Sequence, residues 1–326
     1  MQGQRNDIQF LRGIAVLVVI FCHAFPRWLP YGAIGVDVFF VISGFLMTGM
    51  IVSGVDRGDF TFKGFYIRRA RRLLPASLTT IVATVALALF FLPAVAWPAF
   101  TWQVIGGLTF TANFVMQAQI GDQIYLQPLG HFWSLSLEEQ FYLLFPLLLW
   151  VTPKKLRVPG LALLALESFI FMLIFGNSFL LLHRAWELLV GGIAYCVKDV
   201  PTGRGAKWVA LLLVAVSVTF DLLPLAVLAS AVMIIGKDEW VRAPAIERIG
   251  DWSYSIYLVH WPLISFAAIY YGKTPPPVAA CAVVVVAIGL AALQYRYVEQ
   301  PFRLRKRGRA TTAGDEVSAT ARSMLG

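Results

Sequence analysis

The sequence predicts an all-α, polytopic transmembrane helical bundle of about ten spans with both termini in the cytoplasm. Of its 326 residues, 59% are hydrophobic and only 14% are charged, and such a balance is unusual for a soluble domain. Apolar runs of membrane-spanning length recur along the whole chain. Lysine and arginine gather in alternate connections between these runs, which indicates the orientation of the bundle.

The expected spans follow one another from the N-terminus. They cover residues 8 to 25, 34 to 53, 74 to 96, 135 to 152, 160 to 176, 179 to 197, 206 to 220, 222 to 237, 252 to 271 and 277 to 296. The two runs around Asp221 and Pro224 are short for a bilayer about 30 Å thick, so they are alternatively one broken or re-entrant element. A count of nine would put the C-terminus outside.

The distribution of basic residues favours ten spans. One side then receives Arg5 and the basic segments at 57 to 72, 154 to 157, 198 to 207, 237 to 248 and 303 to 309. The other side receives little more than Arg27, Arg184 and Lys273. Because connections rich in lysine and arginine stay in the cytoplasm, both termini are expected there. The net charge of +9 therefore reflects topology and attraction to membrane lipids, and it requires no nucleic-acid partner.

Two segments depart from the pattern of spans and short connections. Residues 1 to 302 form the predicted integral membrane domain, and residues 303 to 326 form a basic tail that we expect to be disordered in the cytoplasm. The outer connection from about Trp97 to His131 contains no lysine or arginine. Its portion from residue 104 to 116 is too short to span, so we expect it to lie along or dip into the membrane as a lid over an outer cavity.

Arg12 and His23 stand inside the first apolar run, where charged and titratable groups are costly. At about 100° per residue, their spacing returns to within roughly 20° of the starting direction, so both side chains share one helix face. They are separated along the helix by about 16 Å. A shared polar face through most of a membrane span favours a functional site.

The three cysteines indicate neither a disulfide framework nor a metal site. Cys22, Cys196 and Cys281 are scattered among apolar runs, and their spacing is not that of metal ligands. Cys22 is next to His23, but adjacent side chains on a helix point about 100° apart and do not converge. We interpret all three as small buried hydrophobic residues, and no metal is implied.

Six motifs in order resemble the acyltransferase family 3 of integral membrane O-acyltransferases. They read RNDIQFLRGIAVLVVIFCHA, GVDVFFVISGFLMT, FYIRRARRLLPA, HFWSLSLEEQFYLLFP, DWSYSIYLVHWPLI and YRYVEQPFR. The resemblance covers essentially the whole chain from Arg5 to Arg303, without the extracytoplasmic hydrolase-like domain that some members carry. It implies transfer of an acyl group, commonly acetyl from acetyl-CoA, to a carbohydrate hydroxyl beyond the membrane. The expected location is the cytoplasmic (inner) membrane of a bacterium, with a cell-envelope polysaccharide among the acceptors.

The resemblance assigns roles to four residues. The arginine and histidine of the family's first motif correspond to Arg12 and His23, and its RxxR element corresponds to Arg69 and Arg72. Arginines suit the phosphates of coenzyme A because their hydrogen bonds are charge-assisted and often bidentate. Arg12, deeper in the membrane, would neutralise the inner phosphates or orient the pantetheine arm. His23 would act as general base on the acceptor hydroxyl or form a transient acyl-imidazole, and the sequence does not separate these mechanisms.

Two carboxylates are second-tier candidates for the site. Asp37 lies in the opening turns of the second span, where it would orient His23 or the substrate. Glu138 lies in SLSLEEQF near the outer end of the fourth span. Only one of Glu138 and Glu139 need face the interior, and the choice of Glu138 rests on the resemblance.

Other polar residues near span ends have simpler interpretations. Aromatic and histidine side chains are common at membrane interfaces, so we interpret His131, Trp133, His260 and Trp261 as interfacial anchors. Glu299, before a proline, is interpreted as a helix-end group.

Two other classes of function would also use charges within the membrane. A transporter or flippase for a lipid-linked or acidic substrate is one alternative, although we find no paired broken helices at matching positions in two halves. A structural or sensory protein is the other, and it would leave the cost of Arg12 unexplained. The identity of the acceptor and the length of the acyl chain do not follow from the residues.

Overall fold

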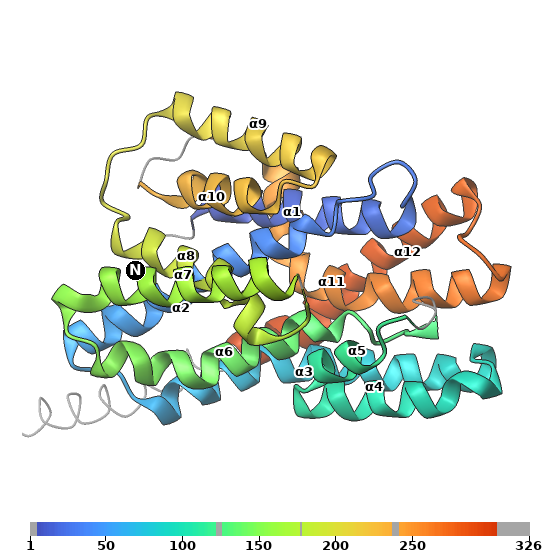
Figure 1. The fold of residues 1–326 in the computed structure, drawn as a ribbon. Helices are drawn as coiled ribbons and strands as arrows, with labels where there is room; N and C mark the ends of the chain where they lie inside the picture. Colours follow the sequence, from blue (N-terminus) through green and yellow to red (C-terminus); the bar gives the residue numbers. More distant parts are fainter. Residues whose placement is uncertain (1–4, 122–125, 177, 237–240, 305–326) are drawn as a thin grey trace, which may run out of the picture.

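The fold is a bundle of helices, most of which run roughly side by side across the view in Figure 1. The computed structural model describes residues 5–121, 126–176, 178–236 and 241–304, and this part of the chain contains no β-strand. The α-helices are α1 (Asn6–Ala24), α2 (Ile34–Arg57), α3 (Phe62–Phe91), α4 (Trp97–Thr109), α5 (Ala112–Ala118), α6 (Phe132–Val151), α7 (Arg157–Phe175), α8 (Leu181–Cys196), α9 (Arg204–Phe220), α10 (Leu223–Ile234), α11 (Pro244–Tyr271), α12 (Pro277–Gln294) and α13 (Gln300–Leu304). A π-helical turn, Tyr295–Glu299, joins α12 to α13.

The all-helical class is confirmed, and each expected span falls on a helix. Within the described residues, five helical segments are long and apolar enough to cross a membrane, namely Asn6–Ala24, Ile34–Arg57, Phe62–Phe91, Lys154–Phe175 and Pro277–Phe302. The count of ten spans and the cytoplasmic termini stay predictions. The runs around Asp221 form two separate helices, α9 and α10, because Asp221 adopts a left-handed conformation (φ 58°) between them. The predicted disorder of the tail concerns residues that, from 305 onward, lie outside the described part.

Helices α1 and α11 approach closely because each has a glycine at the contact. A Cβ atom on Gly13 would lie 2.3 Å from the carbonyl oxygen of Ile246. A Cβ atom on Gly250 would lie 1.9 Å from that of Gln9. Both distances are far below van der Waals contact, so only glycine permits this spacing of the two backbones.

A second close contact joins α2 to α8 in the same way. A Cβ atom on Gly44 would meet the backbone of Leu188, and one on Gly191 would meet the carbonyl oxygen of Val41. These small residues let the two backbones approach, as in many helix pairs within membranes. The closely packed pair of α2 and α8 lies beside α1, which contacts α2.

Helices α4 and α5 form the short pair that covers one end of α6 in Figure 1. Gln140, near the middle of α6, donates hydrogen bonds to the carbonyl oxygen of Phe110 at 2.9 Å and to Asn113 Oδ1 at 2.7 Å. The tip between α4 and α5 therefore reaches about halfway along α6. The expectation that this segment lies along or dips into the membrane as a lid over an outer cavity stays a prediction.

The two largest of the four buried hydrophobic clusters in the described residues bring most of the helices together. The larger one joins α1, α2, α6, α8, α10 and α11, with Val16, Val41 and Leu188 fully buried. The smaller one joins α3, α4, α6 and α11 around Phe100, Phe132 and Leu258. Helices α6 and α11 contribute residues to both clusters. They therefore border the space where the two clusters meet. The candidate site lies there.

Candidate active site

Arg12 and His23 both contact side chains of α11. Arg12 Nη2 donates to Ser253 Oγ at 2.8 Å, and His23 Nδ1 lies 3.0 Å from His260 Nε2. Ser253 and His260 are close to two helical turns apart, so they too share one face. The predicted common face of Arg12 and His23 is thus the face that packs on α11.

Three of the four histidines of the chain lie together at the end of this contact. We call His23, His131 and His260 the histidine cluster. His131 and His260 have exposed fractions of 4% and 0%, and their ring centroids are 6.0 Å apart. Trp261 is also buried and packs edge-on against His23, with centroids 4.6 Å apart. The interpretation of His131, His260 and Trp261 as interfacial anchors is therefore wrong, because the protein itself encloses them.

Trp133 is half-buried and also packs against other side chains of the protein. Its ring packs against Phe40 and Phe179, and the Arg184 guanidinium lies 5.3 Å from a Trp133 ring centre.

Glu299 is not the simple helix-end group that its position before a proline suggested. It is 1% exposed within the π-helical turn and accepts a hydrogen bond from Ser255 Oγ at 2.9 Å.

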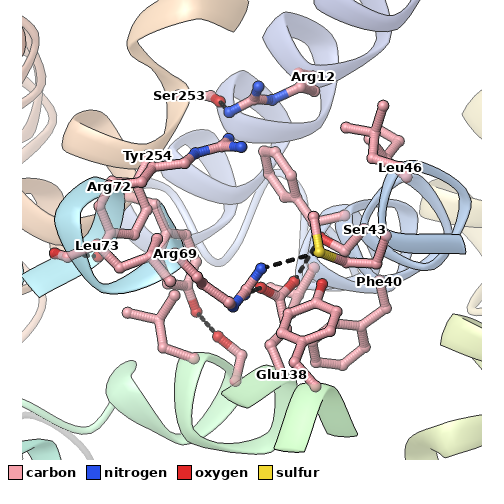
Figure 2. A pocket seen from close by; sticks show the side chains of 18 residues that line it. Arg12, Phe40, Ser43, Leu46, Arg69, Arg72, Leu73, Glu138, Ser253 and Tyr254 are labelled. Atoms are coloured by element: carbon pink, nitrogen blue, oxygen red, sulfur yellow. Dashed lines mark hydrogen bonds and ion pairs between the residues drawn. The ribbon is translucent and has the colours of Figure 1, made fainter. Parts of the chain in front are cut away.

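A cavity lies between five helices, with arginine side chains reaching into it (Figure 2). Its lining residues come from α1, α2, α3, α6 and α11, and they are Arg12, Val36, Phe39, Phe40, Ile42, Ser43, Leu46, Met47, Arg69, Arg72, Leu73, Ser134, Leu135, Glu138, Tyr142, Ser253, Tyr254 and Tyr257. Ser134 and Tyr257 hydrogen-bond to each other at 2.6 Å. Tyr257 precedes His260 by about one helical turn, so this pair lies between the cavity and the histidine cluster.

A second, more open cavity adjoins the first. It is lined by Gln9, Arg12, Leu46, Met50, Arg68, Arg71, Arg72, Asp251, Tyr295 and Phe302. We call it the basic vestibule, because four arginines face one aspartate there. Arg12, Leu46 and Arg72 line both cavities. Arg68 and Arg71 belong to the basic segment at 57 to 72 and had no predicted binding role, and their place in the lining adds them to the site.

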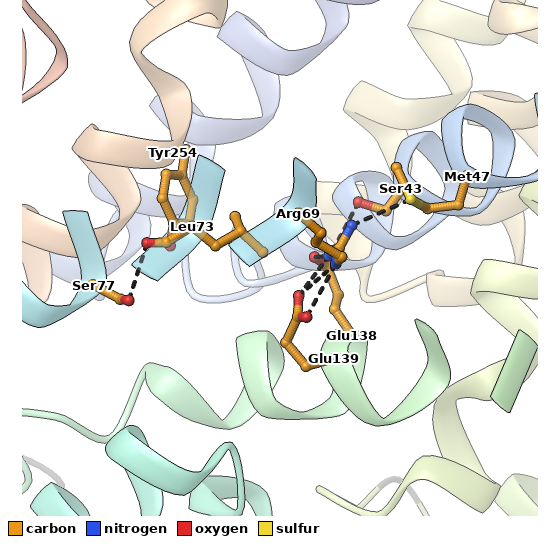
Figure 3. A network of polar contacts seen from close by, with 8 residues as sticks. All are labelled: Ser43, Met47, Arg69, Leu73, Ser77, Glu138, Glu139 and Tyr254. Carbon is orange, nitrogen blue, oxygen red and sulfur yellow. Dashed lines mark hydrogen bonds and ion pairs between the residues drawn. The ribbon is translucent and has the colours of Figure 1, made fainter. Parts of the chain in front are cut away.

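Arg69 is paired inside the protein, as Figure 3 shows. Its Nη2 lies 2.6 Å from Glu139 Oε1 and 4.0 Å from Glu138 Oε2. The guanidinium also lies 3.5 Å from the centre of the Tyr142 ring. Two carboxylates and an aromatic face therefore already compensate the charge of Arg69, unlike those of Arg68 and Arg71, whose side chains are exposed.

Both glutamates of SLSLEEQF meet Arg69, although only Glu138 lines the cavity. Glu138 Oε1 accepts a hydrogen bond from Ser43 Oγ at 2.8 Å. Glu138 thus connects α2, α3 and α6 at the cavity wall. Its position agrees with the choice of Glu138 over Glu139 as the cavity-facing carboxylate.

Asp37 does not contact His23. It forms an ion pair with Arg184 of α8, and Arg184 Nε lies 2.9 Å from Glu187 Oε1. All three residues are buried, and none lines either cavity. The pairing that sequence analysis considered, Asp37 with His23, is therefore replaced by a buried charge cluster between α2 and α8. Arg184 and Glu187 were not predicted as members of it.

Comparison with known proteins adds the family to this geometry. A family model described as an acyltransferase domain matches residues 5–296. The chain belongs to the acyltransferase family 3. Two relatives are the O-acetyltransferase OatA of Staphylococcus aureus strain NCTC 8325 and that of strain COL; each is 30% identical over 351 residues, which cover 91% of this chain and 57% of the relative. No solved structure matches the chain.

This member of the acyltransferase family 3 spans little more than half the length of the curated relatives that it matches. The family and the apolar helices together make it a membrane protein. Within the described residues, no group of three or more histidine, cysteine, aspartate or glutamate side chains is arranged to hold a metal ion. The polar groups near the cavities are instead arginines, carboxylates, hydroxyls and imidazoles.

Proposed function

We propose that the protein is a membrane-bound O-acyltransferase that moves an acyl group from a cytoplasmic acyl-CoA to a hydroxyl of an extracytoplasmic carbohydrate. Acetyl-CoA is the proposed donor, because the similar Staphylococcus proteins are named O-acetyltransferases. The observation that carries the proposal is the adjacency of the two cavities and the histidine cluster. The basic vestibule shares Arg12, Leu46 and Arg72 with the narrower cavity. Ser134 and Tyr257, which line the narrower cavity, both donate to the carbonyl oxygen of His131 in the histidine cluster.

The shape and charge of these cavities suit the two ends of coenzyme A. Its phosphates need cations at an open surface, which the vestibule supplies through Arg68, Arg71, Arg72 and Arg12. Arginine is well suited to phosphate because its planar group presents several donors in a fixed geometry. Binding there would leave the pantetheine arm directed into the narrower cavity.

The wall of the narrower cavity would hold the arm. Arg69 is part of the proposed donor site because it lines the cavity wall. Glu138 and Glu139 offset its charge. Glu138, the member of this group that lines the cavity, would accept a hydrogen bond from an amide of the arm. The thioester would then lie against Ser134 and Tyr257, whose mutual hydrogen bond would have to open for the thioester to reach the histidine cluster.

The reaction requires one proton acceptor, and His23 is the proposed group. As the acceptor hydroxyl attacks the thioester carbonyl, His23 takes the hydroxyl proton and a new C–O bond forms. The C–S bond then breaks, and the proton passes from His23 to the departing thiolate. The products are an O-acyl ester and coenzyme A. A route through an acyl-imidazole would use the same nitrogen as nucleophile.

Asp37 has a supporting place in this scheme. Its ion pair with Arg184 joins the N-terminal end of α2 to that of α8. The part of the cavity wall that α2 forms would depend on this attachment.

We propose that the protein lies in the inner membrane of a bacterium, with the vestibule on the cytoplasmic side.

The proposal is tested by measuring release of coenzyme A from acetyl-CoA by purified protein supplied with an envelope glycan fraction. We expect wild-type protein to release coenzyme A and to leave base-labile acetate on the glycan. His23→Ala should abolish both, because it removes the proton acceptor. His183→Ala is the matched control, since His183 contacts Gly176 O at 3.0 Å and lies outside the cluster. Absence of release by wild-type protein with any glycan fraction or small glycoside would favour a transporter instead.

A further inference from the structure

The histidine cluster contains a directed chain of hydrogen bonds. His260 Nδ1 lies 2.7 Å from the carbonyl oxygen of Tyr257 and 3.1 Å from that of Ile256. Its other nitrogen, Nε2, lies 3.0 Å from His23 Nδ1. The chain thus runs from the backbone of α11 through one imidazole to the other.

The carbonyl end of the chain determines which nitrogens carry protons. A carbonyl oxygen only accepts hydrogen bonds, so His260 Nδ1 must donate. In a neutral imidazole the second nitrogen is then an acceptor. His260 Nε2 therefore accepts from His23 Nδ1–H, and the lone pair of His23 lies on Nε2.

The relative orientation of the rings supports this assignment. Their planes differ by only 6°, and their centroids are 5.2 Å apart. A nitrogen–nitrogen distance of 3.0 Å is compatible with that separation only if the rings meet edge to edge, close to a common plane. In this arrangement the N–H of one ring points along the lone pair of the other. The Trp261 ring also packs edge-on against the His23 ring, and this contact limits rotation of the His23 ring.

Burial makes the contact selective. His260 is 0% exposed, so water does not compete for its Nε2. The Tyr257 carbonyl belongs to the interior of α11, so its oxygen is near a helical hydrogen-bond donor even without His260. Loss of the His260 ring nitrogens would therefore chiefly affect His23 rather than the backbone of α11.

We propose that His260 is a positioning residue that holds His23 in the tautomer with its proton on Nδ1 and its lone pair on Nε2. The inference rests on the proposed function in one respect: the group that His23 Nε2 deprotonates is the hydroxyl of the acyl acceptor. When His23 Nε2 takes that proton, His23 becomes an imidazolium whose Nδ1–H still donates to His260. The same contact therefore orients the neutral base and stabilises its charged form, and no other reactant is needed.

The test combines a spectroscopic measurement with turnover. Protein labelled with ¹³C and ¹⁵N in histidine gives signals from only four side chains, which single substitutions assign. The ring-carbon and nitrogen shifts of His23 report its tautomer without requiring catalysis. We compare wild-type protein with His260→Phe, which keeps a ring but no acceptor, and with His260→Gln, whose side-chain carbonyl reaches toward the position of Nε2. His183→Phe is the matched control at a buried histidine outside the cluster.

The expected result is an Nδ1-protonated His23 in wild-type protein and a mixture of tautomers in His260→Phe. Turnover of acetyl-CoA should fall about 100-fold in His260→Phe with little change in donor KM, because positioned proton transfer contributes at least that factor. His260→Gln should retain more turnover than His260→Phe. A role in packing alone would favour the apolar ring of Phe over Gln and would reverse this order.

Other results would overturn the inference. An Nε2-protonated His23 in wild-type protein contradicts it whatever the turnover, and so does equal turnover of wild-type protein and His260→Phe. If wild-type protein shows the expected tautomer but transfers no acyl group to any acceptor, the hydrogen-bond chain is supported while the proposed function fails. The two failures are therefore distinguishable.

Discussion

Arg69, which lines the narrower cavity, forms its closest ion pair at 2.6 Å with Glu139, which does not line it. The two side chains are 11% and 20% exposed, so water screens their interaction only partly. Removing one partner of such a pair leaves the other charge poorly solvated, which costs more than the pair itself contributes. The RxxR element thus combines two roles, because Arg69 supports the wall and Arg72 faces both cavities.

Replacing Arg69 with methionine should therefore destabilise the protein. We expect the free energy of unfolding to fall by about 3 kcal/mol, because Glu138 and Glu139 lose their shared cation. Chemical denaturation in detergent micelles measures this change. Adding Glu139→Gln to Arg69→Met should restore part of the loss by removing one unpaired charge. A single variant as stable as the wild type would show that the pair contributes nothing to folding.

The exposed arginines of the vestibule should behave differently. Arg68→Ala and Arg71→Ala should each weaken binding of acetyl-CoA about threefold without changing stability, since exposed charge pairs contribute below about 1 kcal/mol. The effect should shrink at high salt, because the screening length shortens. Isothermal titration at two salt concentrations measures both. Lys155→Ala removes an exposed cation elsewhere and is the control; an equal loss in that variant would indicate only a long-range charge effect.

The contrast between Arg12 and Arg69 shows how much of the site could be predicted from sequence. The position of Arg12 and His23 on one face follows from helix periodicity, which acts within a single helix. The partner of Arg69 lies 70 residues away and that of His23 lies 237 residues away. Contacts at such separations depend on how helices pack, and no local pattern encodes them. The fold class was predictable for the same reason, because composition and span length are local properties.

The contacts of Asp37, His131 and His260 were also beyond prediction from local sequence patterns. Asp37 lies 147 residues from Arg184, so no local pattern indicated this pair, and the prediction was that Asp37 orients His23 or the substrate. The histidines at 131 and 260 stand beside tryptophan or phenylalanine in apolar stretches, a pattern typical of interfacial anchors as well as of buried clusters. The burial of His260 follows from the close packing of α11 on α1, which depends in part on glycines such as Gly250.

The glycine contact between α1 and α11 should be sensitive to a single methyl group. Gly250→Ala should push α1 away from α11 and lower stability by about 1 to 3 kcal/mol, the usual cost of overpacking. It should also reduce turnover, because the contacts of Arg12 with Ser253 and of His23 with His260 cross this interface. Thermal unfolding and acetyl-CoA turnover measure the two effects. Gly289→Ala is the control, since an added Cβ there meets nothing within 4 Å; similar losses in both variants would contradict the steric argument.

The buried charge cluster of Asp37, Arg184 and Glu187 leads to a prediction that separates stability from chemistry. Arg184→Met leaves two buried carboxylates without a cation and should lower the free energy of unfolding by about 3 to 5 kcal/mol. Asp37→Asn keeps the ion pair of Arg184 with Glu187, so its cost should be smaller. Denaturation of the purified variants measures this difference.

Turnover per folded molecule then tests whether Asp37 acts on His23. Because Asp37 contacts Arg184 and lines neither cavity, Asp37→Asn should lose less than tenfold in turnover once folded protein is counted. His23→Ala should lose at least about 100-fold under the same conditions, since it removes the proton acceptor. A loss in Asp37→Asn as large as that in His23→Ala, with unchanged stability, would return Asp37 to the catalytic group. Because Asp37 is paired with Arg184 rather than with His23, we expect the smaller loss in Asp37→Asn.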